Sequence, residues 1–168
     1  SNHVVKAIAQ FERTLISANS KLDRYLNNEE QLTISELNGY AIFNTEKGDC
    51  FHCHASQLFM DNLFHNNGLD LEPFLDLGRA KVTSNALDNG KFKTPTLRNI
   101  EMTAPYMHDG RFATLEEVVE HYDSGGKYST TIDPLMKKLG IGLQLTNQEK
   151  IDLVAYLKTL TDHEFITQ

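Results

Sequence analysis

Apolar residues recur at helical spacing in four parts of this chain. Over residues 4–18 they return every three or four positions, which predicts an amphipathic helix. Three further apolar repeats each follow a capping box, in which a Thr and a Glu three residues later satisfy free amides at the start of a helix. The boxes begin at Thr33, Thr114 and Thr146. We therefore expect three more helices that each turn an apolar face toward a core.

The remaining apolar and polar positions predict where helices end and where loops lie. The helix after Thr114 is expected to end at the Ser-Gly-Gly run of residues 124–126, a strong C-terminal signal. Asp133, followed by a proline, predicts a short helix that extends to Leu139. About residues 66–112 show little periodicity and contain several Gly and Pro residues. A long irregular stretch inside a compact domain is usually functional or wrapped around something, so the pattern predicts an all-α domain with long loops.

Length and charge narrow the class of protein. A chain of 168 residues fits one domain with its own core. Its formal net charge of -7 argues against nucleic acid as a partner, because little would neutralise the phosphates. No apolar run approaches the roughly 20 residues that a membrane-spanning helix needs. The composition therefore favours a globular domain whose function lies in a local motif.

The clearest chemical motif is the run CFHCH at residues 50–54, which has the form C-x-x-C-H. Two thiols at this spacing reach the two vinyl groups on one edge of a porphyrin, and the following histidine coordinates the iron. A thioredoxin-like pair would sit beside a βαβ pattern, a zinc site would need two more ligands at matched spacing, and a disulfide would close only a very short loop. The motif predicts one covalent c-type haem, wrapped by the long loops, with Cys50 and Cys53 as attachment points and His54 as an axial ligand.

Spacing alone leaves the sixth ligand of the iron open. A Met in an apolar stretch usually fills the core, and a Tyr usually packs its ring and hydrogen-bonds its hydroxyl. The candidates are four methionines, two histidines and one tyrosine: Met60, Met102, Met107, Met136, His108, His121 and Tyr122.

Three further runs carry a resemblance to a known family. They are FKTPTLRNI at residues 92–100, TAPYMHDG at 103–110 and TLEEVV at 114–119, in this order after the C-x-x-C-H motif. Together they resemble the bacterial di-haem cytochrome c peroxidase family, which includes the MauG-type enzymes. The resemblance extends from about residue 5 to about residue 160. It implies a cytochrome c-like fold.

The family has two such domains, each with its own C-x-x-C-H, and the resemblance implies that this chain is the C-terminal, electron-transfer one. Residues 1–22 would be an inter-domain segment with its N-terminal helix, and residues 23–168 the haem domain. The domain would relay electrons to a peroxidatic haem on a missing N-terminal domain, for reduction of hydrogen peroxide or for MauG-like oxidation of a protein. Alone it would have little activity. The alternatives are a stand-alone mono-haem cytochrome c that carries electrons and, less favoured, an open haem iron that binds a small ligand.

The resemblance also implies partners and a compartment. The partners would be the peroxidatic domain of the same protein and a small redox donor protein, and a homodimer of the full-length form is a further expectation. Haem is usually attached to such motifs outside the cytoplasm, so we expect a periplasmic protein. The chain opens with Ser1 and Asn2 and shows no signal peptide, which we interpret as a mature or trimmed chain.

Family positions assign roles to further residues. The peroxidase members carry a Met ligand on the helix after the Thr-Leu-Glu box, whereas MauG-type members carry a Tyr there. Tyr122 falls at this position, so the resemblance implies that it ligates the iron, with His121, Met107 or an open site as alternatives. A phenolate oxygen favours ferric iron, whereas a thioether raises the potential.

Four other residues have expected roles. Arg98 is a candidate partner for a haem propionate, because a guanidinium binds a carboxylate bidentately; the alternative is a surface ion pair. His108 either hydrogen-bonds in the haem pocket or is structural. Thr103 and Pro105 match family positions whose backbone carbonyls help to hold a calcium ion between the two domains, in the full-length protein. The remaining histidines are expected at the surface: His3, His52, His65 and His163.

Overall fold

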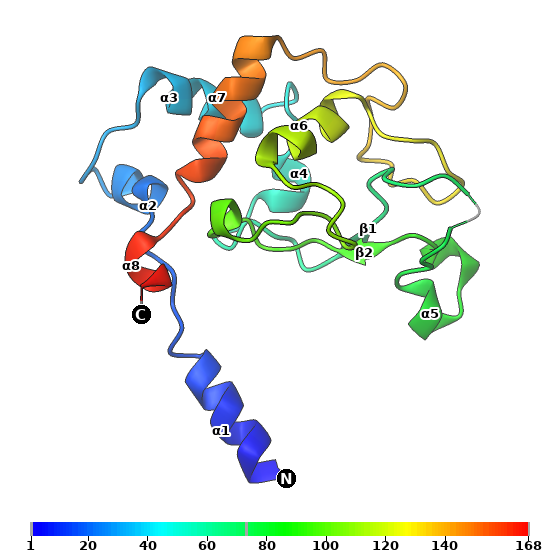
Figure 1. Ribbon diagram of the computed structural model, residues 1–168, viewed down its shortest axis with the longest axis horizontal. Coiled ribbons are helices and arrows are strands. Elements are labelled where there is room, and N and C mark those ends of the chain that lie inside the picture. The colour runs from blue at the N-terminus through cyan, green and yellow to red at the C-terminus, as the bar shows by residue number, and fades with distance from the viewer. Residues whose placement is uncertain (1, 73, 168) are drawn as a thin grey trace.

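The computed structural model describes residues 2–72 and 74–167. Its α-helices are α1 Asn2–Glu12, α2 Lys21–Leu26, α3 Ile34–Phe43, α4 Phe51–His54, α5 Ala80–Thr83, α6 Leu115–Asp123, α7 Asn147–Lys158 and α8 His163–Ile166. Two 3-10 helices are η1 Ala86–Asp88 and η2 Ile100–Met102. Strands β1 Phe64–His65 and β2 Phe92–Lys93 form an antiparallel pair. Figure 1 shows a helix-rich body with long connecting loops, as expected for the all-α class.

The three predicted capping boxes are confirmed. At the start of α3, α6 and α7, the Thr hydroxyl accepts the amide N–H of the Glu three residues later, and that Glu carboxylate accepts the amide N–H of the Thr. The structure adds a fourth box, which the sequence analysis missed, between Ser20 and Asp23 at the start of α2. These boxes use only neighbours in sequence, which is why they could be recognised from the residue pattern.

Helices α3 and α7 cross closely and form the centre of the core. At Gly39 of α3, an added Cβ would lie 2.0 Å from the backbone oxygen of Asp152 in α7 and 2.7 Å from the Cβ of Tyr156. The Phe43 and Tyr156 rings pack 5.1 Å apart, and both are almost completely buried. The main hydrophobic cluster includes Leu22, Leu32, Ile42, Tyr106, Leu115, Val119, Leu145, Leu153, Val154, Leu157 and Leu160.

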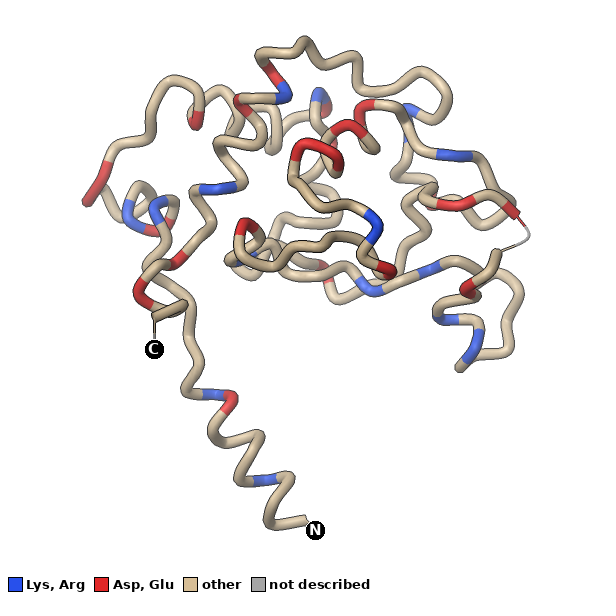
Figure 2. Tube along the Cα trace, viewed as in Figure 1, with Lys and Arg blue, Asp and Glu red and all other residues tan. Residues whose placement is uncertain are grey.

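Ion pairs join the helices at the surface of this core. Basic residues are spread along the chain and alternate with acidic ones (Figure 2). Lys150 of α7 lies 2.6 Å from both Glu120 and Asp123 of α6, and so ties these two helices together. Such exposed pairs contribute about 0–1 kcal/mol each, so the apolar core dominates the stability.

The predicted helix over residues 4–18 is too long. Helix α1 ends at Glu12, and Figure 1 shows it standing away from the rest of the molecule. The backbone amides of Ala18 and Asn19 instead donate to the carboxylate of Asp162, at 3.0 and 2.9 Å. These bonds hold residues before α2 in an extended path beside the start of α8, which a continued helix could not follow.

The predicted helix that ends at Leu139 is wrong. Asp133 does begin a single turn, because its Oδ1 accepts the amide of Leu135 at 2.8 Å. Beyond that turn the chain forms further turns, with Gly140 and Gly142 at positive φ. The amide of Leu143 then donates to the Asp123 carbonyl at the end of α6. This return to α6 ends the helical path.

The division of the chain after residue 22 stays a prediction. Helix α1 has no buried residue, whereas Ser20 and Leu22 are 1% and 2% exposed. The predicted boundary falls inside α2, so the structure places the start of the packed body slightly earlier, near Ala18. In the described ranges, no helix has the length and apolar character to cross a membrane.

Replacing Gly39 with Ala should destabilise the chain, although Ala is the better helix former by about 1 kcal/mol. The added methyl group would meet the Asp152 carbonyl, so the two backbones must separate. We expect the free energy of unfolding to fall by about 2–4 kcal/mol, measured by urea denaturation. Ala41→Gly on the exposed side of the same helix is the matched control, with a loss of about 1 kcal/mol. A Gly39→Ala chain as stable as the parent would contradict the close crossing.

Candidate functional site

The C-x-x-C-H motif forms the short helix α4. Cys50 is the N-cap residue, and its carbonyl accepts the amides of Cys53 and His54 at 3.3 and 3.1 Å. Residues three and four positions apart lie on the same side of a helix. The turn therefore brings both sulfurs and the imidazole to one side, and all three residues are half-buried.

A hydrogen bond fixes the tautomer of the His54 imidazole. Its Nδ1 lies 2.6 Å from the carbonyl oxygen of Phe59. A carbonyl can only accept, so Nδ1 carries the proton and Nε2 keeps a free lone pair. Burial lowers the pKa of His54, which keeps the ring neutral. Ligating histidines in proteins usually donate their second nitrogen in this way, so His54 fits the role of proximal ligand to a haem iron.

The loop that holds His54 is fixed to the core. The Phe59 amide donates to Ser56, and the Phe59 ring packs edge-on against Phe43 at 6.4 Å. Phe43 in turn packs on Tyr156 of α7. The orientation of the imidazole is therefore set through the same aromatic contacts that form the core.

Both cysteines are free thiols. Burial raises the pKa of Cys50 to about 12 and that of Cys53 to about 11, and nearby carboxylates add to both shifts. A protonated thiol is a poor metal ligand and a slow partner in disulfide exchange. These shifts argue against a redox-active pair.

Tyr122 lies on α6. Its Oη accepts a hydrogen bond from Nδ2 of Asn67 at 3.2 Å. Burial raises the pKa of Tyr122, and the charges of Cys50 and Cys53 raise it further. Tyr122 therefore lies within electrostatic range of both motif sulfurs.

Two other candidates for the sixth ligand lie around the same asparagine. Met107 Sδ accepts a hydrogen bond from Nδ2 of Asn67 at 3.6 Å. His121 Nε2 lies 3.1 Å from the backbone oxygen of Asn67, and burial lowers the pKa of this histidine. By contrast, Met102 is 55% exposed. The sequence analysis missed Asn67, because nothing in its neighbourhood along the chain marks it.

Arg98 is held in an ion pair. Its Nη1 and Nη2 atoms bind the Asp23 carboxylate at 2.9 and 3.0 Å, and its Nε donates to the Gln57 carbonyl at 2.9 Å. The pair is largely buried and links α2 to the loop after the motif. The Arg98–Asp23 contact corresponds to the ion-pair alternative, although the pair is largely buried and does not lie at the surface. The propionate role stays a prediction.

The remaining predicted residues lie near the surface. The ring of His108 stacks on Phe92 of β2, with 3.6 Å between ring centres. Thr103 and Pro105 are exposed, and the backbone oxygens of both accept no hydrogen bond from the described residues. Those oxygens are therefore available to a cation, as the calcium prediction requires.

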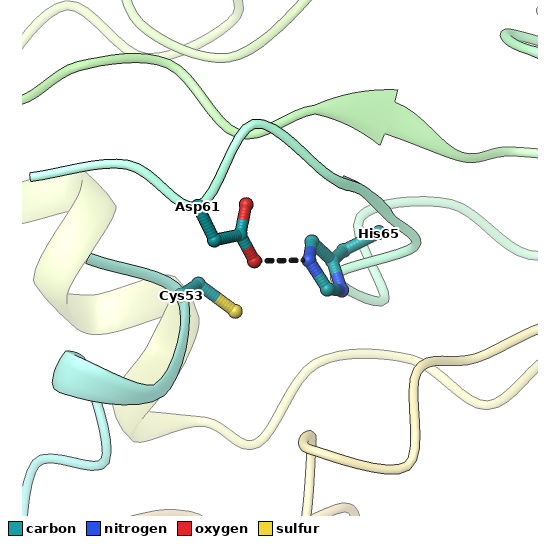
Figure 3. A group of neighbouring side chains, drawn as sticks. All are labelled: Cys53, Asp61 and His65. Carbon is teal, nitrogen blue, oxygen red and sulfur yellow. Dashed lines mark hydrogen bonds and ion pairs between the residues drawn. The ribbon is translucent and has the colours of Figure 1, made fainter. Parts of the chain in front are cut away.

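His65 is not the surface residue that the sequence analysis expected. Its two ring nitrogens lie 2.6 Å from Asp133 and 2.7 Å from Asp61, and its side chain is only 16% exposed. Figure 3 shows Asp61 and His65 beside Cys53. Burial opposes the charged ring, but the hydrogen bonds to Asp133 and Asp61 outweigh it and raise the pKa of His65.

This trio also has ligand atoms close enough to hold a metal ion, all within 4.8 Å of one another. In the structure, however, both nitrogens of His65 are already engaged by carboxylates. We therefore interpret the group as a charged cluster at the edge of the motif.

A half-buried C-x-x-C-H helix with a correctly oriented histidine, in a helix-rich domain, defines the class of c-type haem domains. Comparison with known proteins agrees. The family model described as di-haem cytochrome c peroxidase matches residues 1–31. The methylamine utilization protein MauG of Methylorubrum extorquens is 38% identical over 95% of this chain and 44% of its own length. Cytochrome c551 peroxidase of Nitrosomonas europaea is 37% identical, with the same coverage of both chains.

A solved structure supports the fold. The crystal structure of a MauG-like protein associated with microbial copper homeostasis superposes with a TM-score of 0.82 at 40% identity, over 89% of this chain and 50% of that one. The chain belongs to the di-haem cytochrome c peroxidase and MauG family, which confirms the resemblance seen in the sequence. It spans about half the length of the relatives it matches.

Stability should depend on pH through His65. Its folded-state pKa lies above the unfolded value of 6.5, so its contribution is complete below that pH and disappears as the pH rises through the folded-state value. We expect His65→Gln to cost about 1–2 kcal/mol at acidic pH and much less at alkaline pH, measured by urea denaturation across this range. The exposed His163→Gln is the control. Equal losses at both ends of the pH range would show that His65 is not held as a cation.

Proposed function

We propose that this chain is the C-terminal, electron-transfer haem domain of a di-haem cytochrome c peroxidase-like oxidoreductase. The observation that carries the proposal is the Nδ1 bond of His54 to the Phe59 carbonyl at 2.6 Å. It leaves Nε2 free beside two protonated thiols. Membership of the family adds support, because the di-haem members hold their cofactor through such motifs.

Haem c, when bound, supplies one-electron redox chemistry at its iron. The residues of this chain then have distinct tasks. Cys50 and Cys53 would hold the porphyrin and His54 would bind its iron, while the Phe59 carbonyl fixes the tautomer of His54. His65, hydrogen-bonded to Asp61 and Asp133, lies beside Cys53.

Tyr122 is proposed as the sixth ligand. It is half-buried, and it lies within electrostatic range of both sulfurs. Its hydroxyl oxygen accepts a hydrogen bond only from Asn67 among the described residues. A hard anionic oxygen at this position favours the ferric state. Arg98 and His108 are proposed to contact the cofactor, Arg98 at a propionate and His108 in the pocket.

If His54 and Tyr122 both bound the iron, no position on it would be left for peroxide. Peroxide chemistry also needs an acid-base group above an open iron. Because the chain spans about half of its relatives, we assign that chemistry to a peroxidatic haem on an N-terminal domain of the same protein. The substrate is hydrogen peroxide or, in a MauG-like variant, a protein that is oxidised.

Partners and location follow from this role. A small redox protein would donate electrons, and the carbonyls of Thr103 and Pro105 would help to hold calcium against the second domain. The full-length form is proposed to be periplasmic and able to form a homodimer. A stand-alone mono-haem electron carrier is less favoured, because the relatives are about twice as long.

Covalent haem attachment can be tested directly. When the chain is made in a host with cytochrome c maturation machinery, we expect one haem that resists extraction by acidified organic solvent. Cys50→Ala or Cys53→Ala should leave one thioether and lower the yield, and the double variant should release its haem completely. Mass spectrometry and the pyridine haemochrome spectrum measure the outcome. An extractable haem on the parent chain would overturn the assignment.

If the domain only relays electrons, it should transfer electrons without consuming peroxide. The haem-loaded chain should exchange single electrons with a small redox protein, yet consume peroxide at a rate close to the background. Stopped-flow absorbance follows the first reaction, and a peroxide electrode follows the second. Sustained peroxide turnover by this chain alone would place the peroxidatic chemistry here and refute the relay.

A further inference from the structure

Asn67 contacts three of the candidates for the sixth ligand, Tyr122, Met107 and His121. We propose that it selects this ligand: its side-chain amide positions Tyr122 and Met107, while its backbone carbonyl holds Nε2 of His121 as a donor and so removes this nitrogen from the competition. The inference rests on the proposed haem attachment at Cys50 and Cys53. It assigns a positioning role to a residue that does not itself touch the iron.

The side-chain amide has two hydrogens and two acceptors. Nδ2 donates to Tyr122 Oη at 3.2 Å and to Met107 Sδ at 3.6 Å. A primary amide can satisfy both bonds at the same time. The Tyr122 oxygen and the Met107 sulfur thus share one donor nitrogen. The distance between them cannot exceed the sum of the two hydrogen-bond lengths. A hard and a soft donor are held side by side.

For His121 the roles are reversed: Asn67 accepts the hydrogen bond instead of donating it. Its Nε2 lies 3.1 Å from the Asn67 backbone oxygen. Because a carbonyl only accepts, Nε2 must carry the proton, and a protonated nitrogen has no lone pair for a metal. The His121 ring also packs against Phe112, 5.9 Å between centres. His121 is therefore fixed as a donor to the backbone.

The segment around Asn67 is rigid enough for such a role. The preceding Asn66 is 2% exposed, and its Nδ2 donates to the hydroxyls of Ser129 and Thr131 at 3.0 Å each. Gly68, at φ +70°, bonds Lys127 through its carbonyl at 2.7 Å. An added Cβ at Gly68 would lie 2.9 Å from the Lys127 nitrogen. Buried polar bonds on both sides hold Asn67 in place, which is what a supporting residue of a functional site requires.

The two amide bonds have different consequences for the ligands. Donation to a phenolate oxygen withdraws electron density and moderates its preference for ferric iron, as hydrogen bonds to metal ligands generally do. Donation to the thioether occupies one sulfur lone pair and holds Met107 next to Tyr122. The structure therefore makes Met107 the reserve ligand, available when the oxygen is removed.

The test uses the haem-loaded chain and its ferric spectra and midpoint potential. Asn67→Leu and the isosteric Asn67→Asp both remove the two amide donors and keep the backbone carbonyl. We expect each variant to load haem normally, to change the ferric optical and electron paramagnetic resonance spectra, and to shift the midpoint potential to a more negative value. Unchanged spectra and potential in both variants would overturn the role of Asn67.

The Tyr122→Phe background tests the reserve ligand. We expect this variant to gain the spectral signature of thioether ligation and a more positive potential. The signature should disappear in Tyr122→Phe/Met107→Leu and weaken in Tyr122→Phe/Asn67→Leu. Met102→Leu, at an exposed methionine of the same region, is the matched control and should change nothing. A Tyr122→Phe chain without a thioether signature, or one that keeps it without Met107, would refute the arrangement.

Haem content separates this inference from the proposed function. A parent chain that attaches no haem would refute the proposed function itself. A parent chain and variants that attach equal amounts of haem, with identical spectra, would leave the proposed function intact and refute only the positioning role of Asn67.

Discussion

The close crossing of α3 and α7 is the constraint on which the rest of the structure depends. Only a glycine at position 39 lets the two backbones approach to this distance. The crossing places Phe43 against Tyr156, and Phe59 packs on Phe43 from the loop after the motif. Because the Phe59 carbonyl binds His54, the orientation of the proposed proximal ligand follows from a helix contact far from it in sequence. The core and the site therefore share one set of contacts.

The opposite side of the site depends on polar rather than apolar contacts. Residues 66–68 are held by buried amide and hydroxyl groups, and this short segment reaches Tyr122, Met107 and His121 on other elements. A hydrogen bond fixes direction as well as distance, so it suits a place where ligand donors must point at one metal. Apolar packing positions the loop that holds His54, and directional bonds position the residues around Tyr122.

Most of the local features could be predicted from the sequence. The C-x-x-C-H motif, the capping boxes at Thr33, Thr114 and Thr146, and the family resemblance all depend on residues close together along the chain. The failed predictions depended on distant partners. The first helix ends early because Asp162 binds the amides of Ala18 and Asn19. The expected helix before Leu139 is lost where the chain turns back to the end of α6.

The same division holds for the site. The sequence by itself predicted haem attachment at Cys50, Cys53 and His54 and limited the candidates for the second iron ligand, because thiol spacing and side-chain chemistry are local properties. Only the tertiary structure decided that His65 lies buried between two carboxylates and that Asn67 joins three candidate ligands. These contacts join residues 40 or more positions apart in most cases. Folding alone brings such residues together, and no spacing along the chain encodes their directions.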